Sequence, residues 1–586
     1  MAPWWQPETL PAPQDPTTLS PSGPYRAWKQ LGLVVLCGMW VVLGLLGHDP
    51  WKVEDATSFG IVWDLLQSHA WLTPTLVGEP YIDRPPLVYD LAAFFELAFG
   101  RILDPDDAAR LSVALLLGST LYLIGLTGRE LAGRAMRWMP VLLFVGSIGL
   151  WDRAHQLAPE IGLLTGLAIA QYGFALAARR SSLGGVIIGT GAGFAFWSYG
   201  WLGPIWIVAA ALLLPLVFAQ WRTRGYASTA ALAALVGAAT IGAWPLALST
   251  IAPAHLGAWW SNQTIATYFA PASTTGWIDP WNIPKNLPWF TWPASPLVVW
   301  TLWTRARGFN GGVRSVGVQV PGALALAILI GLLLMPDPRA SHLMMLILPL
   351  SLLGALEVDT LKRGFSSALD WFGILTFGLL GALAWAIWWD SYLHGMPLAV
   401  ARAFRDTLVG YRPSFHGREI ITCVLLTVLW LVIVRPARRS NRRAILNWAA
   451  GTTLLWAMYS TIWLPYLDSR RSYRVVAETA AVHLPKDGCI ASRNLGEPQR
   501  ALFYYFAGIR TEREESRPGH VCQTLIVQYG GHDRDTAVSQ GWIPVWTGQR
   551  RGDDTERYVI YRRSSAGAPA AETTDTTARE RARPVV

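Results

Sequence analysis

Residues 48–99 read HDPWKVEDATSFGIVWDLLQSHAWLTPTLVGEPYIDRPPLVYDLAAFFELAF and combine acids, bases, prolines and aromatics directly after an apolar segment. Two adjacent carboxylates, Glu54 and Asp55, open an amphipathic run, and one helix and turn later comes the cluster DRPP at residues 83–86. A carboxylate and a guanidinium on one loop provide an acid–base group and a phosphate-binding group. We therefore expect the rest of the chain to be the scaffold for this loop.

The composition is that of a polytopic α-helical membrane protein. Of the 586 residues, 52% are hydrophobic and only 15% are charged, which is too apolar for a water-soluble globule. The 32 tryptophans fit aromatic belts at the two membrane interfaces. The net charge of +9 comes from short basic clusters between apolar segments rather than from one basic face, which argues against nucleic-acid binding.

Apolar runs predict about thirteen membrane spans. The first run is interpreted as an anchor rather than a cleaved signal peptide, because no small-x-small site follows it and many further spans do. Residues 1–28 begin with a proline-rich stretch and are expected to form a disordered cytoplasmic tail. The apolar runs are residues 31–47, 109–131, 138–151, 158–177, 184–197, 202–218, 227–250, 287–303, 320–335, 341–356, 371–389, 419–434 and 444–464.

Basic residues alternate between successive loops, as the positive-inside rule requires. This alternation places the N-terminus in the cytoplasm and the long loops 48–108, 251–286 and 390–418 outside, together with everything after residue 464. Four arginines in loop 390–418 are an exception, which long loops tolerate and which binding of an anionic substrate would explain. They are Arg402, Arg405, Arg412 and Arg418. The cytoplasmic clusters are Arg134 and Arg137, Arg179 and Arg180, Arg222 and Arg224, Arg305, Arg307 and Arg314, Lys362 and Arg363, and residues 435–443.

From residue 467 to residue 564 the pattern changes to that of a small soluble α/β domain, and residues 565–586 are expected to be disordered. The domain contains no GxGxxG, Walker, HExxH or GxSxG sequence. Its expected helices cover residues 473–483 and 498–506, and its expected strands cover 488–492, 524–529, 542–546 and 558–561. Cys489 and Cys522 lie beside expected strands, so we expect a disulfide in an oxidising compartment, with two buried free thiols as the alternative.

The acids of the first loop have two interpretations. Glu54 and Asp55 in a first helical turn are favoured by the helix dipole, so helix capping alone explains them. Beside a membrane, either carboxylate could instead be the general base for an acceptor hydroxyl or amine. The residues alone do not say which of the two acids would act.

A rigid turn follows the first acids. Two prolines after Asp83 and Arg84 stop any helix and hold the arginine near the lipid headgroups. Its guanidinium is suited to binding a phosphate, and Tyr81 and Asp83 are further substrate-binding candidates. The alternative is an interfacial arginine that reaches the headgroups along its aliphatic stem.

A second outer turn reads DRAHQLAPE at residues 152–160. Pro159 is expected to open a helix with Glu160 in its first turn, where an acid is costly unless it serves a partner. Glu160 is therefore a catalytic candidate and Arg153 a substrate-binding candidate. His155 is interpreted as a polar interfacial residue rather than a ligand.

A third outer turn reads PDPRASH at residues 336–342. Asp337, Arg339 and His342 crowd this turn and could face the same cavity as the other candidates. Arg339 and His342 are substrate-binding candidates on that hypothesis. Turn composition alone would also explain these residues.

The chain resembles the GT-C fold glycosyltransferases that use polyprenyl-phosphate sugars, in particular the group that contains the lipid A aminoarabinose transferases and protein O-mannosyltransferases. The resemblance covers most of the membrane part, whereas the C-terminal domain shows no specific match. It is carried by EDATSFGIVWDLLQSHAWLTPTLVGEPYIDRPPLVYDL, AARLSVALLLGSTLYLIGLTGRELAGR, LAPE, LPWFTWPASPL and RASHLMMLILPLSLLGA. The family typically has an Asp-Glu pair, then an acid-Lys-Pro-Pro element and a Pro-Asp turn. Here the pair is reversed, Arg84 replaces the lysine and Glu160 replaces the aspartate.

This resemblance implies an inverting transfer of sugar from a polyprenyl-phosphate donor to an acceptor on the outer face of the bacterial cytoplasmic membrane. The acceptor would be lipid A or another glycolipid, a protein or a cell-envelope glycan. A loop acid would deprotonate it, and Arg84 would stabilise the leaving phosphate. The sequence itself establishes no cofactor and leaves open a divalent metal ion shared by Asp83 and His255. The alternatives are a transporter or flippase of a lipid-linked substrate, and a non-catalytic scaffold for the C-terminal domain.

Overall fold

The computed structural model describes residues 24–81, 83–261, 281–335, 338–394, 413, 415–435, 440–485, 488–515, 522–530, 541–550, 553 and 555–564. The chain divides into two compact units, Met1–Ser472 and Tyr473–Val586. Helix α1 (Pro24–Val42) begins inside the stretch expected to be a tail. The rest of both expected tails lies outside the described residues, as do Asp337, Arg402, Arg405 and Arg412.

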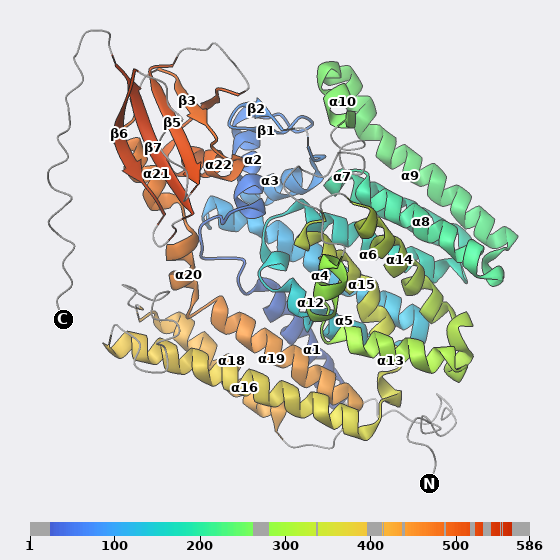
Figure 1. The fold of residues 1–586 in the computed structure, drawn as a ribbon. Coiled ribbons are helices and arrows are strands. Elements are labelled where there is room, and N and C mark those ends of the chain that lie inside the picture. Colours follow the sequence, from blue (N-terminus) through green and yellow to red (C-terminus); the bar gives the residue numbers. More distant parts are fainter. Residues whose placement is uncertain are drawn as a thin grey trace. The chain divides into compact units, whose positions relative to one another are not determined.

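Unit 1 is built from helices (Figure 1). Within the described ranges, six are long and apolar enough to cross a membrane: α4 (Pro105–Ala132), α6 (Pro159–Ala177), α9 (Arg224–Ile251), α14 (Val316–Leu334), α16 (Arg363–His394) and α18 (Gly417–Val434). The further helices are α5 (Met139–Val145), α7 (Ser181–Tyr199), α8 (Leu202–Val217), α10 (Pro253–Trp260), α12 (Asn282–Phe290), α13 (Ala294–Ala306), α15 (Ala340–Ala355), α19 (Asn441–Tyr459) and α20 (Leu464–Arg471). The expected total of thirteen spans is not confirmed.

Two expected spans are not single helices. The run 138–151 contains only the seven residues of α5, after which the chain passes into the short 3-10 turns η2 (Ile148–Leu150) and η3 (Arg153–His155). The run 287–303 is divided into α12 and α13 on either side of Pro293, whose ring and missing N–H oppose a continuous helix. Apolar composition located these segments but did not reveal their breaks.

The loop after α1 is folded. It consists of α2 (Glu54–Ser68), the hairpin strands β1 (Thr75–Leu76) and β2 (Glu79–Pro80), and α3 (Leu87–Phe99). The buried Asp64 fixes the hairpin to α2, because its carboxylate accepts hydrogen bonds from the Thr75 hydroxyl at 2.6 Å and the Gly78 backbone N–H at 2.9 Å. A loop tied down in this way can hold side chains in fixed positions over the helices.

Small residues let α6 and α7 approach closely. A Cβ at Gly166 would lie 2.6 Å from the backbone nitrogen of Ala195, and one at Gly162 would lie 2.5 Å from the Ser198 hydroxyl. Such contacts are typical of helix pairs in membranes, where close van der Waals packing replaces hydrophobic burial. This contact brings the start of α6 next to the end of α7, where Tyr199 lies. In another part of unit 1, α16, α18 and α19 lie side by side (Figure 1).

Unit 2 contains a five-stranded sheet in the order β4-β3-β5-β7-β6. Strand β3 is parallel to β4 and β5, whereas β7 is antiparallel to β5 and β6. The elements are α21 (Arg474–Ala481), β3 (Ile490–Arg493), α22 (Glu497–Ala507), β4 (Glu512–Arg513), β5 (Thr524–Gly530), β6 (Trp542–Gly548) and β7 (Glu556–Arg563). The sequence located all of these except the two-residue strand β4.

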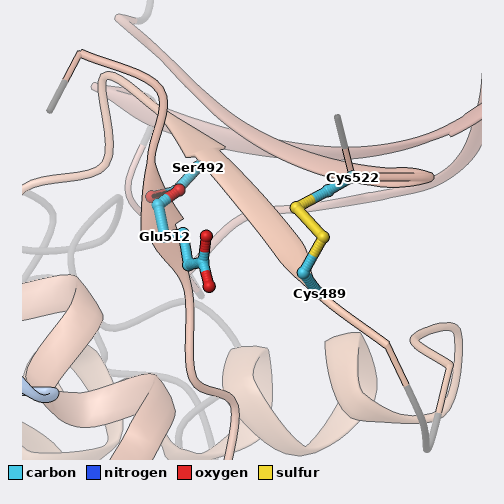
Figure 2. The surroundings of a disulfide bond; sticks show 4 residues. All are labelled: Cys489, Ser492, Glu512 and Cys522. Atoms are coloured by element: carbon cyan, nitrogen blue, oxygen red, sulfur yellow. Dashed lines mark hydrogen bonds between the residues drawn. A yellow bond between two sulfur atoms is a disulfide. The ribbon is translucent and has the colours of Figure 1, made fainter. Parts of the chain in front are cut away.

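Cys489 and Cys522 are joined by a disulfide with a Cα–Cα distance of 5.3 Å (Figure 2). The bond lies where β3 and β5 begin, so it fastens two neighbouring parallel strands at the same edge. The other two cysteines, Cys37 and Cys423, are free and buried in helices of unit 1.

Candidate functional site

A cavity of about 350 Å³ collects residues from all three outer turns with functional candidates. They come from the start of α2, the turn before α6 and the start of α15. The lining residues are Val53, Glu54, Asp152, Arg153, Gln156, Ala158, Glu160, Arg339, Ser341 and Met344. Segments far apart in the sequence thus bring two acids and two arginines of the predicted set into one cavity.

Glu54 and Arg339 form an ion pair across this cavity. The Arg339 Nη1 donates to the Glu54 Oε1 at 3.0 Å, and the two side chains are 54% and 32% exposed respectively. Glu54 is the first residue of α2, where the helix dipole favours a negative charge. A ligand can therefore reach both groups of this ion pair from solvent.

Asp55 faces away from the cavity and is fully buried. Its carboxylate accepts two hydrogen bonds from the Arg110 guanidinium, at 3.1 and 3.3 Å, and one from the Leu157 backbone N–H at 2.9 Å. Burial by itself would raise the pKa of this carboxyl, but the charge of Arg110, with His48 and these hydrogen bonds, holds it below its usual value. Asp55 therefore fastens α2 to α4 and to the segment before α6.

Arg110 is the centre of a buried charge cluster. Its Nη1 also donates to Asp106 at 3.1 Å, to Asp107 at 3.0 Å and to the His48 carbonyl at 3.0 Å. Asp107 in turn accepts from the Gly47 backbone N–H. This network fixes the start of the loop and the first turn of α2. The sequence analysis did not predict it. An arginine inside the apolar run 109–131 was the available signal, since such residues are costly without partners.

Glu160 lies in the first turn of α6, which opens at Pro159 as the sequence predicts. The side chain is buried, and its Oε1 accepts a hydrogen bond from the Ser341 hydroxyl at 3.1 Å. Within the described residues, its Oε2 has no hydrogen-bond partner. A buried carboxyl oxygen without a hydrogen-bond partner is costly, which is typical of a residue that serves a ligand rather than the fold.

Arg84 is not part of the cavity lining and packs against the end of α7. Its Nη2 donates to the Tyr199 hydroxyl at 2.8 Å, and its guanidinium carbon lies 3.8 Å from the centre of the Tyr199 ring. Burial would lower the pKa of Arg84, but the Tyr199 hydroxyl and the Glu160 carboxylate nearby raise it above its ordinary value. The guanidinium is thus a permanent cation whose orientation is fixed by an aromatic partner.

The Tyr199 hydroxyl also lies 2.7 Å from the Nε2 of His342, a buried residue of α15. The Nδ1 of His342 accepts from the Arg339 backbone N–H at 3.2 Å. A hydrogen-bonded chain therefore runs from Arg84 through Tyr199 and His342 to the turn that carries Arg339. Tyr199 was missed from the sequence, because a tyrosine at the end of an apolar helix is ordinary at a membrane interface.

The other candidates lie outside the cavity lining. Tyr81 and Asp83 are half-buried on the turn beside Arg84. His155, interpreted as a polar interfacial residue rather than a ligand, is buried: it is stacked on Trp456 at 4.3 Å between ring centres, and its Nε2 contacts the Trp40 carbonyl at 2.7 Å. In the part of the chain that the structure describes, no group of three or more His, Cys, Asp or Glu side chains could hold a metal ion.

The chain is similar in sequence to bacterial aminoarabinose transferases. The undecaprenyl phosphate-alpha-4-amino-4-deoxy-L-arabinose arabinosyl transferase 1 of Pseudomonas fluorescens is 23% identical over 374 residues, which cover 61% of this chain and 65% of that protein. The transferase of the same name, without the number, from Pseudomonas aeruginosa is 26% identical over 375 residues, 60% of this chain and 64% of that protein. The chain thus matches just under two thirds of the length of these relatives.

The fold agrees with this similarity. The crystal structure of ArnT from Cupriavidus metallidurans bound to undecaprenyl phosphate matches with a TM-score of 0.66 at 15% identity, covering 91% of this chain and 98% of that chain. No family model matches the chain. The resemblance drawn from the sequence is confirmed: the chain has the GT-C fold and is a multi-pass membrane protein.

Proposed function

We propose that this chain is a membrane glycosyltransferase that moves a sugar from a polyprenyl-phosphate donor to an acceptor. The observation that carries the proposal is the cavity in which Glu54, Arg153, Glu160 and Arg339 meet, with Arg84 outside its lining, on a GT-C scaffold. Relatives whose names state transfer from undecaprenyl phosphate support a donor of that class. The acceptor is a lipid such as lipid A, a protein or a cell-envelope glycan.

Glu54 is the general base in this mechanism, because it is the solvent-accessible acid of the pair. Its carboxylate takes the proton from the acceptor hydroxyl or amine, and the acceptor atom attacks the anomeric carbon of the sugar. The bond between that carbon and the phosphate oxygen breaks, so the polyprenyl phosphate leaves with the bonding electrons. Attack opposite the leaving group inverts the anomeric configuration.

The arginines neutralise the leaving group. Arg84 is a fixed cation and Arg153 and Arg339 line the cavity, so negative charge that develops on the phosphate is stabilised without rearrangement of the site. Glu160 lines the cavity and has one carboxyl oxygen without a hydrogen-bond partner among the described residues, so in this proposal it orients a hydroxyl or amine of the substrates. Asp55 is a positioning residue, since its contacts to Arg110 and Leu157 hold Glu54 opposite α6.

The reaction takes place on the outer face of the bacterial cytoplasmic membrane in this proposal. The positive-inside pattern supports a cytoplasmic N-terminus and an outer location for loop 48–108 and unit 2. The disulfide in unit 2 is consistent with an oxidising compartment. A polyprenyl-phosphate sugar is a donor suited to the outer side, because the activated sugar is attached to a lipid of the membrane.

Transfer by the purified full-length protein in detergent, from an undecaprenyl-phosphate-linked sugar to lipid A, tests the proposal. Glu54→Gln should lower turnover by about 10²–10⁴-fold and leave binding of undecaprenyl phosphate intact, as expected for loss of a general base. Arg84→Ala should weaken both binding and turnover, because the cation contacts phosphate in the ground and transition states. Full transfer activity of Glu54→Gln would exclude Glu54 as the general base. Movement of the donor across the liposome bilayer without sugar transfer would contradict the proposal and favour a transporter.

A further inference from the structure

Asp152, which lines the candidate active-site cavity, has an unusual backbone conformation. Its φ of +60° and ψ of −53° form a γ-turn, in which the Arg153 backbone N–H donates to the Trp151 carbonyl at 2.5 Å. A γ-turn with positive φ is rare and strained for a residue that has a side chain, so contacts outside the turn must hold it. The direction of the next residue, Arg153, depends on this turn.

Arg471, the last residue of α20, holds the Asp152 carboxylate. Its Nη1 donates to both carboxylate oxygens of Asp152, each at 3.1 Å. Its guanidinium carbon also lies 4.6 Å from the centre of the Trp51 ring. Arg471 therefore connects two outer turns of the site, the one that carries Asp152 and the one that carries Trp51.

A second residue of α20 fixes the position of Arg471 relative to the first outer loop. Asp468 precedes Arg471 by three residues, so both lie on the same side of the helix. The Asp468 Oδ1 accepts from the Trp51 Nε1 at 2.9 Å and from the Asp49 backbone N–H at 3.0 Å. Trp51 is buried, and its backbone N–H donates to the Asp55 carboxylate at 3.1 Å. These contacts fasten α20 to the segment that leads into α2.

Arg153 differs from the other arginines of the site in its partners. Arg339 is paired with Glu54, and Arg84 is hydrogen-bonded at the end of α7. Among the residues that the structure describes, the Arg153 guanidinium has no hydrogen bond or ion pair, and its carbon lies 5.7 Å from the centre of the Phe290 ring. Arg153 is exposed and lines the cavity, so its N–H groups can donate to an anionic group of a ligand.

We propose that Arg471 is a positioning residue for the transfer reaction: by holding Asp152 in the γ-turn, it directs the Arg153 guanidinium to the phosphate of the polyprenyl donor. The inference rests on the proposed function, which supplies that phosphate. Arg471 is not part of the cavity lining, and its charge is balanced by Asp152, so it acts on the geometry of the site. Because Arg471 also contacts Trp51, three residues before Glu54, one side chain sets the position of the phosphate-binding cation relative to the general base.

Titration of the full-length protein in detergent with undecaprenyl phosphate, followed by native mass spectrometry, tests this role together with steady-state transfer. Arg153→Ala should weaken binding and raise the KM for the donor about tenfold, the effect of losing one charge-assisted contact. Arg471→Gln should change both about fivefold and kcat less than about twofold, because the contact is weakened alike in the ground and transition states. The variant with both substitutions should bind no more weakly than Arg153→Ala, because Arg471 acts through Arg153.

Two further variants test the γ-turn itself. Asp152→Gly and Asp152→Ala, each combined with Arg471→Gln, both lack the ion pair, but glycine adopts positive φ without steric cost and alanine does not. The glycine variant should therefore bind undecaprenyl phosphate at least about threefold more tightly than the alanine variant. Arg470→Gln is the matched control, because Arg470 is the neighbouring cation of α20 and has no hydrogen bond or ion pair among the described residues. It should bind as the wild type does.

The proposal is overturned if Arg471→Gln binds undecaprenyl phosphate like Arg470→Gln, or if its loss multiplies with that of Arg153→Ala. Equal binding by the glycine and alanine variants would overturn the role of the turn. A raised KM for the acceptor with unchanged donor binding would also overturn the assignment, since Arg153 would then contact the acceptor. Binding is measured without transfer, so the expected binding pattern in a protein that transfers no sugar would contradict the proposed function alone.

Discussion

At the scale of single residues, the separation of Glu54 from Asp55 is the most informative result. Consecutive helical residues point about 100° apart, so neighbouring acids at the start of α2 face different surroundings. Glu54 lines the cavity and Asp55 binds Arg110. The sequence identified the pair as important but could not divide its roles, because the partner Arg110 lies 55 positions away in the chain.

The two acids should therefore respond differently to neutralisation. Asp55→Asn breaks one buried ion pair of Arg110, which keeps Asp106 and Asp107 as partners, so we expect unfolding to become easier by about 3 kcal/mol, the low end of the range for a broken buried ion pair. Glu54→Gln removes an exposed ion pair, worth at most about 1 kcal/mol, and should leave stability almost unchanged. Thermal unfolding of both variants in the same detergent measures the difference. Equal melting temperatures would contradict the structural role of Asp55.

Tyr199 allows a second test at this scale. Tyr199→Phe keeps the ring under Arg84 but removes the hydroxyl that orients the guanidinium and contacts His342. Loss of one such hydrogen bond is worth about 1 kcal/mol, so we expect the KM for the polyprenyl-phosphate donor to rise several-fold. The kcat should change less, because the cation itself is retained. A fall in kcat alone would indicate that Tyr199 acts on the reacting atoms rather than on Arg84.

At the scale of elements, local patterns predicted unit 2 better than unit 1. Strands such as β5 and helices such as α22 are bounded by glycine, proline and charged turns, which are visible in the sequence. Membrane segments lack such signals within apolar runs, so the short α5 and the break before α13 were not foreseen. The cavity was likewise not predictable in detail, because it depends on the packing of three turns separated by long helices.

The buried contact between α1, η3 and α19 makes the free energy of unfolding dependent on pH. His155 is enclosed by Trp40 of α1 and Trp456 of α19, and burial lowers its pKa to about 4. Burial, reinforced by the charge of Arg110, lowers the pKa of His48 to about 4 as well. Between pH 6.5 and pH 4 the unfolded chain binds protons at these histidines that the folded chain does not bind. The free energy of unfolding therefore falls as the pH falls, by about 3 kcal/mol per histidine between pH 6.5 and pH 4.

Between pH 7 and pH 4.5 the melting temperature of the wild type should accordingly fall relative to that of His155→Phe. The phenyl ring preserves stacking on Trp456 but cannot take up a proton. His69→Asn is the control, since His69 is exposed and has φ +56°, a conformation that asparagine tolerates. A decline in His155→Phe as steep as in the wild type and the control would show that this histidine is not the source.

At the scale of the whole molecule, the orientation in the membrane determines whether the proposed reaction is feasible. A sugar carried on a polyprenyl phosphate is a suitable donor for a transferase whose cavity opens on the outer face of the membrane, away from the nucleotide sugars of the cytoplasm. The positive-inside pattern predicts that arrangement, with the segment around Arg314 in the cytoplasm and unit 2 outside.

Cysteine labelling can test this orientation with little background, because Cys37 and Cys423 are buried and Cys489 and Cys522 are bonded to each other. Val482→Cys, at a position 81% exposed on unit 2, should react with a membrane-impermeant maleimide in intact spheroplasts. Arg314→Cys should react only after the membrane is permeabilised. The opposite pattern would place unit 2 and its disulfide in a reducing compartment. Glu54 would then face the cytoplasm as well, because the predicted topology places loop 48–108 and unit 2 on the same side of the membrane, and the proposed outer-face transfer would be wrong.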